Sequence, residues 1–309
     1  NDVDRRERIK GLVRFLRFLG HKQSLYKLGG EDETSIPIVL VGNRPVIKVK
    51  VNKNEEPLNF VLDTGSGISV ISNETAKRLK IKPVTRGGQA RALGGNGKFD
   101  IVYGFLKNIE IGEIKIKNVP VYIREFHQGG QSVDGYIGIS LISKFLTTVD
   151  YGELTFSLAR KDQMVKKASP ADDLSLPLRL TSSGFLSGEI RLEGVENALN
   201  FIVDTGASIS VISDDLANTK ELSPFSHDET MRVIGAAGIT ENVPSFLLPR
   251  LSFGSHSKNS IKAVALDLDI INEASGFVQA GILGGNFLKD YRLTFDFENS
   301  KVIFVPTKK

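Results

Sequence analysis

The sequence carries the same aspartate twice, each time at the end of a short apolar segment. Asp63 lies within LNFVLDTGSGISVIS, residues 58–72, and Asp204 lies within LNFIVDTGASISVIS, residues 199–213; the two strings differ at four of fifteen positions. Burying a carboxylate at the end of a strand costs free energy unless the carboxylate is paired or hydrogen-bonded. One such turn alone indicates ordinary structure, whereas two copies in matching strands predict that the two carboxylates meet.

Two carboxylates in contact would have a defined chemistry. They cannot both ionise readily, so they share one proton and titrate as a pair. The ionised member can take a proton from water while the protonated member polarises a substrate carbonyl. The sequence has no cysteine, no His-Glu-x-x-His, no Gly-x-Ser-x-Gly and no phosphate-binding glycine loop, so we expect neither a metal nor another cofactor. The isolated histidines are predicted to be surface or packing residues: His21, His127, His227 and His256.

The repeated aspartate belongs to an internal duplication of about 140 residues. Three further landmarks follow each aspartate in one order: a glycine segment thirty residues later (Leu93–Gly97, Ile234–Gly238), a glycine after two apolar residues (Gly138, Gly284), and an aspartate twelve residues beyond it (Asp150, Asp296). From residue 36 onward, short apolar runs alternate with turns, which is typical of strands. Each unit is therefore predicted to be a β domain with one short helix after the later glycine.

The pattern divides the chain into three parts, which we expect to be an N-terminal segment at 1–34 and two lobes at 35–165 and 166–309. A polar, charged and proline-containing stretch, residues 160–175, is predicted to link the lobes. Each lobe is long enough to bury a core of its own.

The N-terminal segment is predicted to form a basic amphipathic helix. Its apolar residues Ile9, Leu12, Val13, Leu16 and Leu19 follow i, i+3, i+4, i+7 spacing, with arginines elsewhere on the helix. A helix docked on the body of the protein is the favoured interpretation. A prosegment lying over the cleft, or a contact with a membrane surface, stays open.

Composition and charge exclude several classes. Apolar content is 40% and charged content 25%, as in globular proteins, and the net charge of +4 is scattered rather than concentrated. We therefore expect no nucleic-acid partner, and no segment reaches the length of a transmembrane span. Because the chain begins with Asn, a leader removed on export is an open possibility, and a periplasmic or secreted location is favoured over a cytoplasmic one.

Taken together, FVLDTGS, FIVDTGA, the glycine segments and the apolar-apolar-Gly motifs YIG and ILG resemble the aspartic peptidase superfamily over about residues 46–305. The resemblance implies two β-barrel-like lobes related by a pseudo-twofold axis, with Asp63 and Asp204 as the catalytic dyad. It further implies supporting roles around the dyad for Thr64, Gly65, Ser66, Gly138, Thr205, Gly206, Ala207 and Gly284. A peptide or protein would be the substrate, and one chain holding both lobes would act as a monomer.

The resemblance is nearer to a fused retroviral-type dimer, as in bacterial aspartyl-protease-family proteins, than to the pepsin type. Both halves carry a glycine-containing candidate flap, and neither flap contains the tyrosine found in pepsins. The flap residues implied to bind substrate are Leu93, Gly94 and Gly95 in the first half and Ile234, Gly235 and Ala236 in the second.

One mismatch between the two halves concerns the residue after Asp-Thr-Gly, which is Ser66 in the first half and Ala207 in the second. A serine hydroxyl there is predicted to hydrogen-bond its neighbouring carboxylate and favour the charged form. Asp63 would then be the ionised partner and Asp204 the protonated one.

An aspartic endopeptidase acting on extended polypeptides is the leading interpretation. A silent peptide-binding module on the same fold is the first alternative. The second is a latent zymogen whose residues 1–34 cover the cleft.

Overall fold

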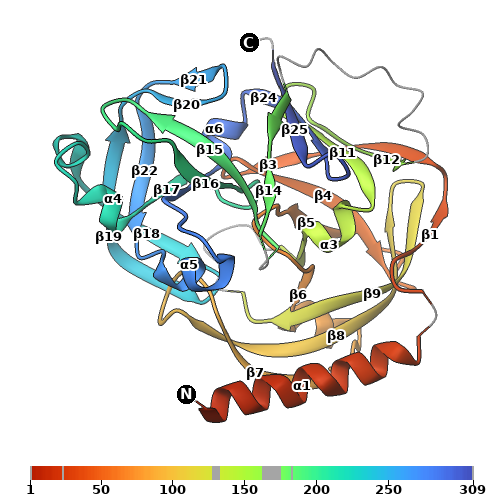
Figure 1. The fold of residues 1–309 in the computed structure, drawn as a ribbon. Coiled ribbons are helices and arrows are strands. Elements are labelled where there is room, and N and C mark those ends of the chain that lie inside the picture. The colour runs from red at the N-terminus through yellow and green to blue at the C-terminus, as the bar shows by residue number, and fades with distance from the viewer. Residues whose placement is uncertain (1, 23, 127–132, 162–174, 182–183, 308–309) are drawn as a thin grey trace.

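The computed structural model describes residues 2–22, 24–126, 133–161, 175–181 and 184–307 (Figure 1). The predicted class is confirmed: the chain is mostly β, with two similar sheet-rich lobes and an N-terminal helix. Strands of the second half gather on the left of Figure 1, and the helix α1 (Asp2–Gly20) runs along the bottom. Among the described residues, no helix is long and apolar enough to cross a bilayer.

Short elements make up both halves. After α1, the elements of the first half are β1 (Lys27–Gly30), β2 (Glu33–Pro37), β3 (Val39–Val41), β4 (Arg44–Val51), β5 (Leu58–Leu62), β6 (Val70–Ser72), α2 (Asn73–Arg78), β7 (Thr85–Arg91), β8 (Lys98–Ile111), β9 (Ile114–Arg124), β10 (Gly135–Ile137), α3 (Ile139–Ile142), β11 (Phe145–Asp150) and β12 (Thr155–Arg160). Those of the second are β13 (Ser175–Pro177), β14 (Arg179–Leu180), β15 (Leu186–Leu192), β16 (Leu199–Val203), β17 (Ser210–Ser213), α4 (Asp214–Ala217), η3 (Ser223–Phe225), β18 (Ser226–Gly235), β19 (Gly238–Leu248), β20 (Leu251–Phe253), β21 (His256–Lys258), β22 (Ile261–Leu266), α5 (Asp269–Ser275), β23 (Gly281–Leu283), α6 (Gly285–Leu288), β24 (Tyr291–Asp296) and β25 (Lys301–Pro306).

The duplication read from the sequence is visible in the strand pairing. In the first lobe β6 pairs in parallel with β9 and antiparallel with β10, and β10 pairs in parallel with β5. In the second lobe β17 likewise pairs in parallel with β22 and antiparallel with β23, and β23 pairs in parallel with β16. The short helices match as well, because Ser72 caps α2 and Ser213 caps α4 through the same side-chain hydrogen bond.

A third sheet joins the two halves. Its order is β13-β25-β24-β11-β12-β2, so β11 and β24 meet antiparallel at the centre and equivalent strands lie outward on either side. The hydroxyl oxygens of Thr148 and Thr294 lie 3.0 Å apart across this centre. The pairing of equivalent strands is what a pseudo-twofold relation requires.

The three-part division of the chain stays a prediction. Most of the segment expected to link the lobes lies outside the described residues. Within the range 1–34, β1 pairs with β9, and Glu33 and Thr34 at the start of β2 pair with β12, so this stretch contributes to two sheets besides α1.

The helix α1 docks on the protein, but of its predicted apolar face only Leu19 packs there, and the main contacts come from aromatic residues outside that face. Phe15 is buried and its ring stacks on Tyr103 with centroids 4.4 Å apart. Gly11 lies so close to the backbone of Gly87 that a side chain at Gly11 would collide with it. The helix therefore packs on the hairpin β7–β8, and Figure 1 shows it along the outer side of that hairpin.

Candidate active site

The two aspartates sit in equivalent loops directly after the matching strands β5 and β16. The Asp63 N–H donates to the carbonyl of Ile137, and the Asp204 N–H donates to the carbonyl of Leu283, both at 3.0 Å. These carbonyls belong to β10 and β23, the short strands that pair alongside. Each loop is thus fixed to the centre of its own sheet, at the point where an apolar strand ends in a carboxylate.

Two buried threonines tie the loops to each other. The Thr64 hydroxyl donates to the carbonyl of Val203 at 2.7 Å and accepts from the Thr205 N–H at 3.0 Å. The Thr205 hydroxyl donates to the carbonyl of Leu62 at 2.7 Å and accepts from the Thr64 N–H at 3.2 Å. Four reciprocal hydrogen bonds therefore hold the two lobes together directly beneath the aspartates.

The glycines of the two loops bring the carboxyl groups together. The Gly65 N–H donates to Asp63 Oδ1 at 2.9 Å and to Asp204 Oδ1 at 3.2 Å, so one donor serves both carboxyls. The Gly206 N–H donates to Asp204 Oδ1 at 2.7 Å. A Cβ at Gly206 would lie 2.6 Å from Asp63 Cγ, and one at Gly65 would collide with the Asp204 carboxyl. Only residues without a side chain allow the loops to approach this closely.

Burial raises the pKa of both carboxyls, but their neighbours act on the two groups differently. Burial raises the pKa of Asp63 most, the neighbouring charge of Asp204 raises it further, and the Arg124 guanidinium opposes the shift. Burial also raises the pKa of Asp204, but backbone N–H donors from Gly206, Gly65 and Ala207 favour its charged form. These influences favour the proton on Asp63 and the charge on Asp204.

The predicted cause of the division of labour between the aspartates is wrong, because the Ser66 hydroxyl makes a different hydrogen bond. The Ser66 hydroxyl donates to the carbonyl of Ile68 at 2.8 Å, within its own loop, and not to a carboxylate. What favours the charged form of Asp204 is the larger number of backbone donors around it. Ser66 and Ala207 both lie in the dyad loops, but their difference does not set the asymmetry.

The two candidate flaps lie at hairpin tips that touch each other. The first is the turn between β7 and β8, which contains Leu93, Gly94 and Gly95. The second is the tip of the hairpin β18–β19, where Ile234 and Gly235 end β18 and Ala236 lies in the turn. The Ala237 N–H donates to the Leu93 carbonyl at 2.9 Å, so one tip hydrogen-bonds the other. Their role in binding substrate stays a prediction.

Two residues beside the dyad were missed by the sequence analysis. Arg124 ends β9, donates to the carbonyl of Ala236 at 2.9 Å, and acts electrostatically on Asp63. Tyr136, on β10, has its pKa raised by burial and also interacts with the Asp63 charge. The motif YIG was treated in the sequence analysis only as two apolar residues and a glycine. YIG begins with a tyrosine, whereas the matching motif ILG begins with an isoleucine, and this difference could have indicated Tyr136.

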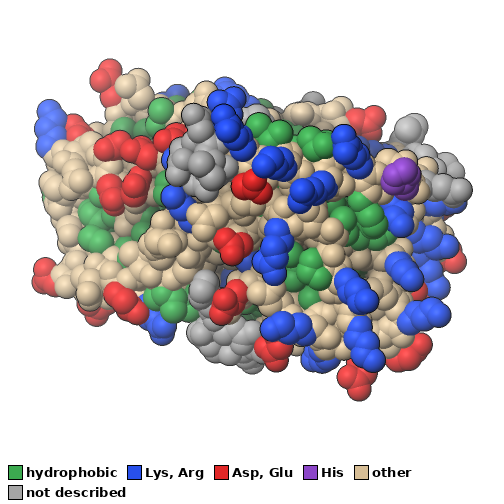
Figure 2. Space-filling model, turned by 90° about the horizontal axis from the view of Figure 1, so that it is seen from below, with side chains coloured by type: hydrophobic (Ala, Val, Ile, Leu, Met, Phe, Trp, Pro, Cys, Tyr) green, Lys and Arg blue, Asp and Glu red, His purple; other side chains and the backbone are tan. Residues whose placement is uncertain are grey.

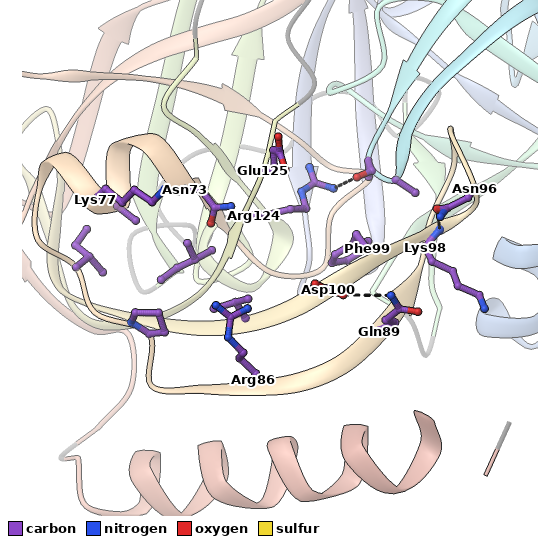
Figure 3. Close-up of a pocket in the computed structure, with 17 residues that line it drawn as sticks. Asn73, Lys77, Arg86, Gln89, Asn96, Lys98, Phe99, Asp100, Arg124 and Glu125 are labelled. Atoms are coloured by element: carbon purple, nitrogen blue, oxygen red, sulfur yellow. Dashed lines mark hydrogen bonds between the residues drawn. The ribbon is translucent and has the colours of Figure 1, made fainter. Parts of the chain in front are cut away.

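A cavity of about 780 Å³ opens next to Arg124, between the hairpin β7–β8 and the body of the first lobe (Figure 3). Its charged lining residues are Lys77, Arg86, Lys98, Asp100, Arg124 and Glu125. Ala236 and Ala237, from the second hairpin tip, also line it. The lining of the cavity therefore carries a net positive charge. The cavity lies beside Arg124, which acts on Asp63, and beside the flap tips.

Metal-binding side chains do not gather in the part of the chain that the structure describes: it holds no group of three or more His, Asp or Glu residues placed to bind an ion.

Comparison with known proteins agrees with this geometry. The family model described as aspartyl protease matches the chain twice, over residues 47–141 and 188–287. Among solved structures, an aspartic proteinase from Irpex lacteus matches with a TM-score of 0.55 and 14% sequence identity, covering 89% of this chain and 98% of that one. A search of curated protein sequences found no match. The chain belongs to the aspartyl protease family, with one copy of the family pattern in each lobe.

Proposed function

We propose that the protein is an aspartic endopeptidase that hydrolyses peptide bonds in extended polypeptides. The observation that carries the proposal is the pair of carboxyls, Asp63 and Asp204, bridged by the single N–H of Gly65 at 2.9 and 3.2 Å. A binding module would gain nothing from burying two like charges face to face, since the arrangement raises the pKa of both.

The proposed mechanism follows from the uneven distribution of the proton. Asp204, as the charged member, takes a proton from a water molecule whose oxygen attacks the scissile carbonyl carbon. Asp63, as the protonated member, hydrogen-bonds the carbonyl oxygen and transfers its proton as the tetrahedral gem-diol forms. Asp204 then gives the proton that it took from water to the amide nitrogen, the C–N bond breaks, and a gem-diol hydroxyl returns its proton to Asp63 as the carboxylic acid product forms.

Substrate entry requires the flap tips to separate. The hydrogen bond between Ala237 and Leu93 joins the two tips, and Arg124 holds the second tip through the carbonyl of Ala236. Backbone groups at both tips would then be available to an extended peptide lying between them.

The test is cleavage of a denatured protein or a peptide library between about pH 3 and pH 7. The wild type is expected to cleave, and Asp63→Asn and Asp204→Asn are each expected to abolish cleavage. Asp228→Asn, at an exposed aspartate of β18, serves as the matched control and should retain full activity. Peptide binding that persists in Asp63→Asn, with no cleavage by the wild type, would instead support the silent binding module.

The zymogen alternative is tested by removing α1 alone. A chain that begins at residue 24 keeps β1 and β2 in their sheets. If only the shortened chain cleaves, the helix is inhibitory. Equal activity of the two chains would contradict that alternative.

A further inference from the structure

The helix α1 has two apolar faces, and only one of them contacts the protein. The contacting face contains Gly11, Phe15 and Phe18, at i, i+4, i+7 spacing. Phe15 stacks on Tyr103, and Phe18 packs edge-on against Phe105 with centroids 5.3 Å apart. Leu19 packs against the same cluster, so these contacts attach the helix to the hairpin β7–β8 through two aromatic side chains and one aliphatic side chain.

The second face consists of Ile9, Leu12, Val13 and Leu16, which we call the outer stripe. Their side chains are 52%, 44%, 40% and 55% exposed, respectively. With 3.6 residues per turn, the i, i+3, i+4, i+7 spacing places all four on one side of the helix, away from the contacting face. A single exposed leucine is ordinary, but four adjacent aliphatic side chains in a row indicate an interaction surface.

The charges around the outer stripe indicate what it contacts. Six exposed cationic residues lie on the same helix: Arg5, Arg6, Arg8, Lys10, Arg14 and Arg17. Glu7 is the one acidic residue between positions 5 and 22, and it pairs with Lys10 at 2.9 Å. Figure 2 views the molecule from below, the side on which α1 lies in Figure 1; Lys and Arg predominate over the right part of that face, with apolar side chains between them.

We propose that the outer stripe of α1 docks the protein on a membrane surface that carries anionic lipid headgroups. A helix that lies in the interface inserts its aliphatic side chains among the acyl chains while its Lys and Arg side chains reach the headgroup phosphates. The helix of 19 residues is about 28 Å long and is held along the outside of the protein, so the whole stripe meets a flat surface at once. A protein partner would need acidic side chains matched to each cation, whereas a lipid surface supplies mobile anionic charge along the full helix.

The experiment measures binding of the full chain to vesicles, and it does not depend on peptidase activity. Sedimentation with phosphatidylcholine vesicles is compared with sedimentation with vesicles holding roughly 30% phosphatidylglycerol, at low and high salt. The wild type is expected to bind the anionic vesicles at low salt and to be released as salt rises. The double variant Ile9→Ser/Leu16→Ser is expected to lose at least about tenfold in partition coefficient, because two buried aliphatic side chains are removed from the acyl region.

Two further variants separate charge from apolar contact. Arg14→Gln is expected to weaken binding to anionic vesicles about fivefold, as the loss of one cation near such a surface implies. Leu180→Ser, at a leucine of β14 that is 60% exposed, removes an equally exposed aliphatic side chain elsewhere and should bind like the wild type. Far-ultraviolet circular dichroism of each variant checks that the fold is retained.

Three results would overturn the proposal. The first is equal binding of the wild type and the double variant to anionic vesicles. The second is no binding by the wild type at low salt. The third is concentration-dependent dimerisation in sedimentation velocity that the double variant loses while neither protein binds vesicles, which would assign the stripe to a second copy of the chain.

Discussion

Arg124 and Leu266 occupy equivalent positions at the ends of matching strands, one in each lobe. Arg124 is aligned with Ser72 in the parallel pair β6–β9, and Leu266 is aligned with Ser213 in the parallel pair β17–β22. At this position the lobe of Asp63 carries a cation and the lobe of Asp204 carries an aliphatic side chain. Because Arg124 lowers the pKa of Asp63, this difference between the lobes affects how strongly Asp63 holds the proton that the dyad shares.

Arg124→Gln is expected to extend activity toward higher pH. Without the guanidinium, one influence that lowers the pKa of Asp63 is removed, so Asp63 keeps its proton to a higher pH and the alkaline limb of kcat/KM moves upward. Lys98→Gln, at an exposed cation lining the same cavity, is the control and should leave the limb in place. A downward or absent shift in Arg124→Gln would show that Arg124 does not act on the titrating group.

Ser66→Ala is expected to leave the pH profile unchanged. The Ser66 hydroxyl is engaged with the carbonyl of Ile68 and makes no hydrogen bond to Asp63 in the structure. Both limbs of kcat/KM should therefore coincide with those of the wild type. A movement of either limb would mean that the hydroxyl turns toward the dyad in the working enzyme.

Local sequence was sufficient to predict the parts of the site that repeat. The matching strings around Asp63 and Asp204 and the equal spacing of the glycine segments predicted the duplicated fold and the meeting of the two loops. Information of this kind is carried by each half separately, and the pseudo-twofold relation then follows from joining two similar β units in one chain.

The parts that do not repeat required the structure. Which atom the Ser66 hydroxyl contacts depends on how its loop turns the Ile68 carbonyl, and spacing in the sequence does not encode that turn. The docking face of α1 depends on the close approach of Gly11 to Gly87 and on ring stacking with Tyr103, both of which are contacts between distant segments. The sequence alone could have indicated Tyr136, because its hydroxyl is the one polar side-chain group in the motif YIG and Ile282 occupies the matching position of the second half.

Gly206→Ala is expected to reduce kcat/KM by roughly a hundredfold or more while the protein still folds. The added methyl carbon would lie 2.6 Å from Asp63 Cγ and 3.1 Å from Asp204 Oδ1, so one carboxyl has to move. Displacements of about 1 Å at a catalytic group are enough for a loss of this size. Gly20→Ala is the matched control, because a methyl there meets nothing within 4 Å, and it should retain wild-type kinetics.

Thr64→Val is expected to lower the free energy of unfolding by about 2–4 kcal/mol, as measured by urea denaturation. Valine keeps the shape of the side chain but leaves the Val203 carbonyl and the Thr205 N–H without their partner in a buried place. Thr148→Val removes a hydroxyl from the same interface that pairs only with Thr294, and its cost should stay below about 1 kcal/mol. Equal losses of unfolding free energy in the two variants would mean that the threonine network stabilises the association of the lobes no more than the contact between Thr148 and Thr294 does.

Asp63→Asn is expected to stabilise the protein at neutral pH while abolishing cleavage. Burial raises the folded-state pKa of Asp63 and of Asp204 above their unfolded values. For acids shifted upward, the contribution to stability is complete below the unfolded pKa of about 3.9 and is lost as pH rises through the folded pKa.

Ionisation of the dyad should therefore lower the free energy of unfolding of the wild type as pH rises above about 4, and that of the variant should fall less. The free energy of unfolding of Asp63→Asn is expected to exceed that of the wild type by about 1–2 kcal/mol at pH 7, with a smaller difference at pH 4. Asp228→Asn, at an exposed position, should follow the wild type at both pH values. Two results would contradict the assignment of the dyad as a buried pair that shares one proton: the same difference in unfolding free energy at both pH values, or a difference of opposite sign at pH 7. Only the ionisation of such a pair makes the stability gained by Asp63→Asn increase with pH.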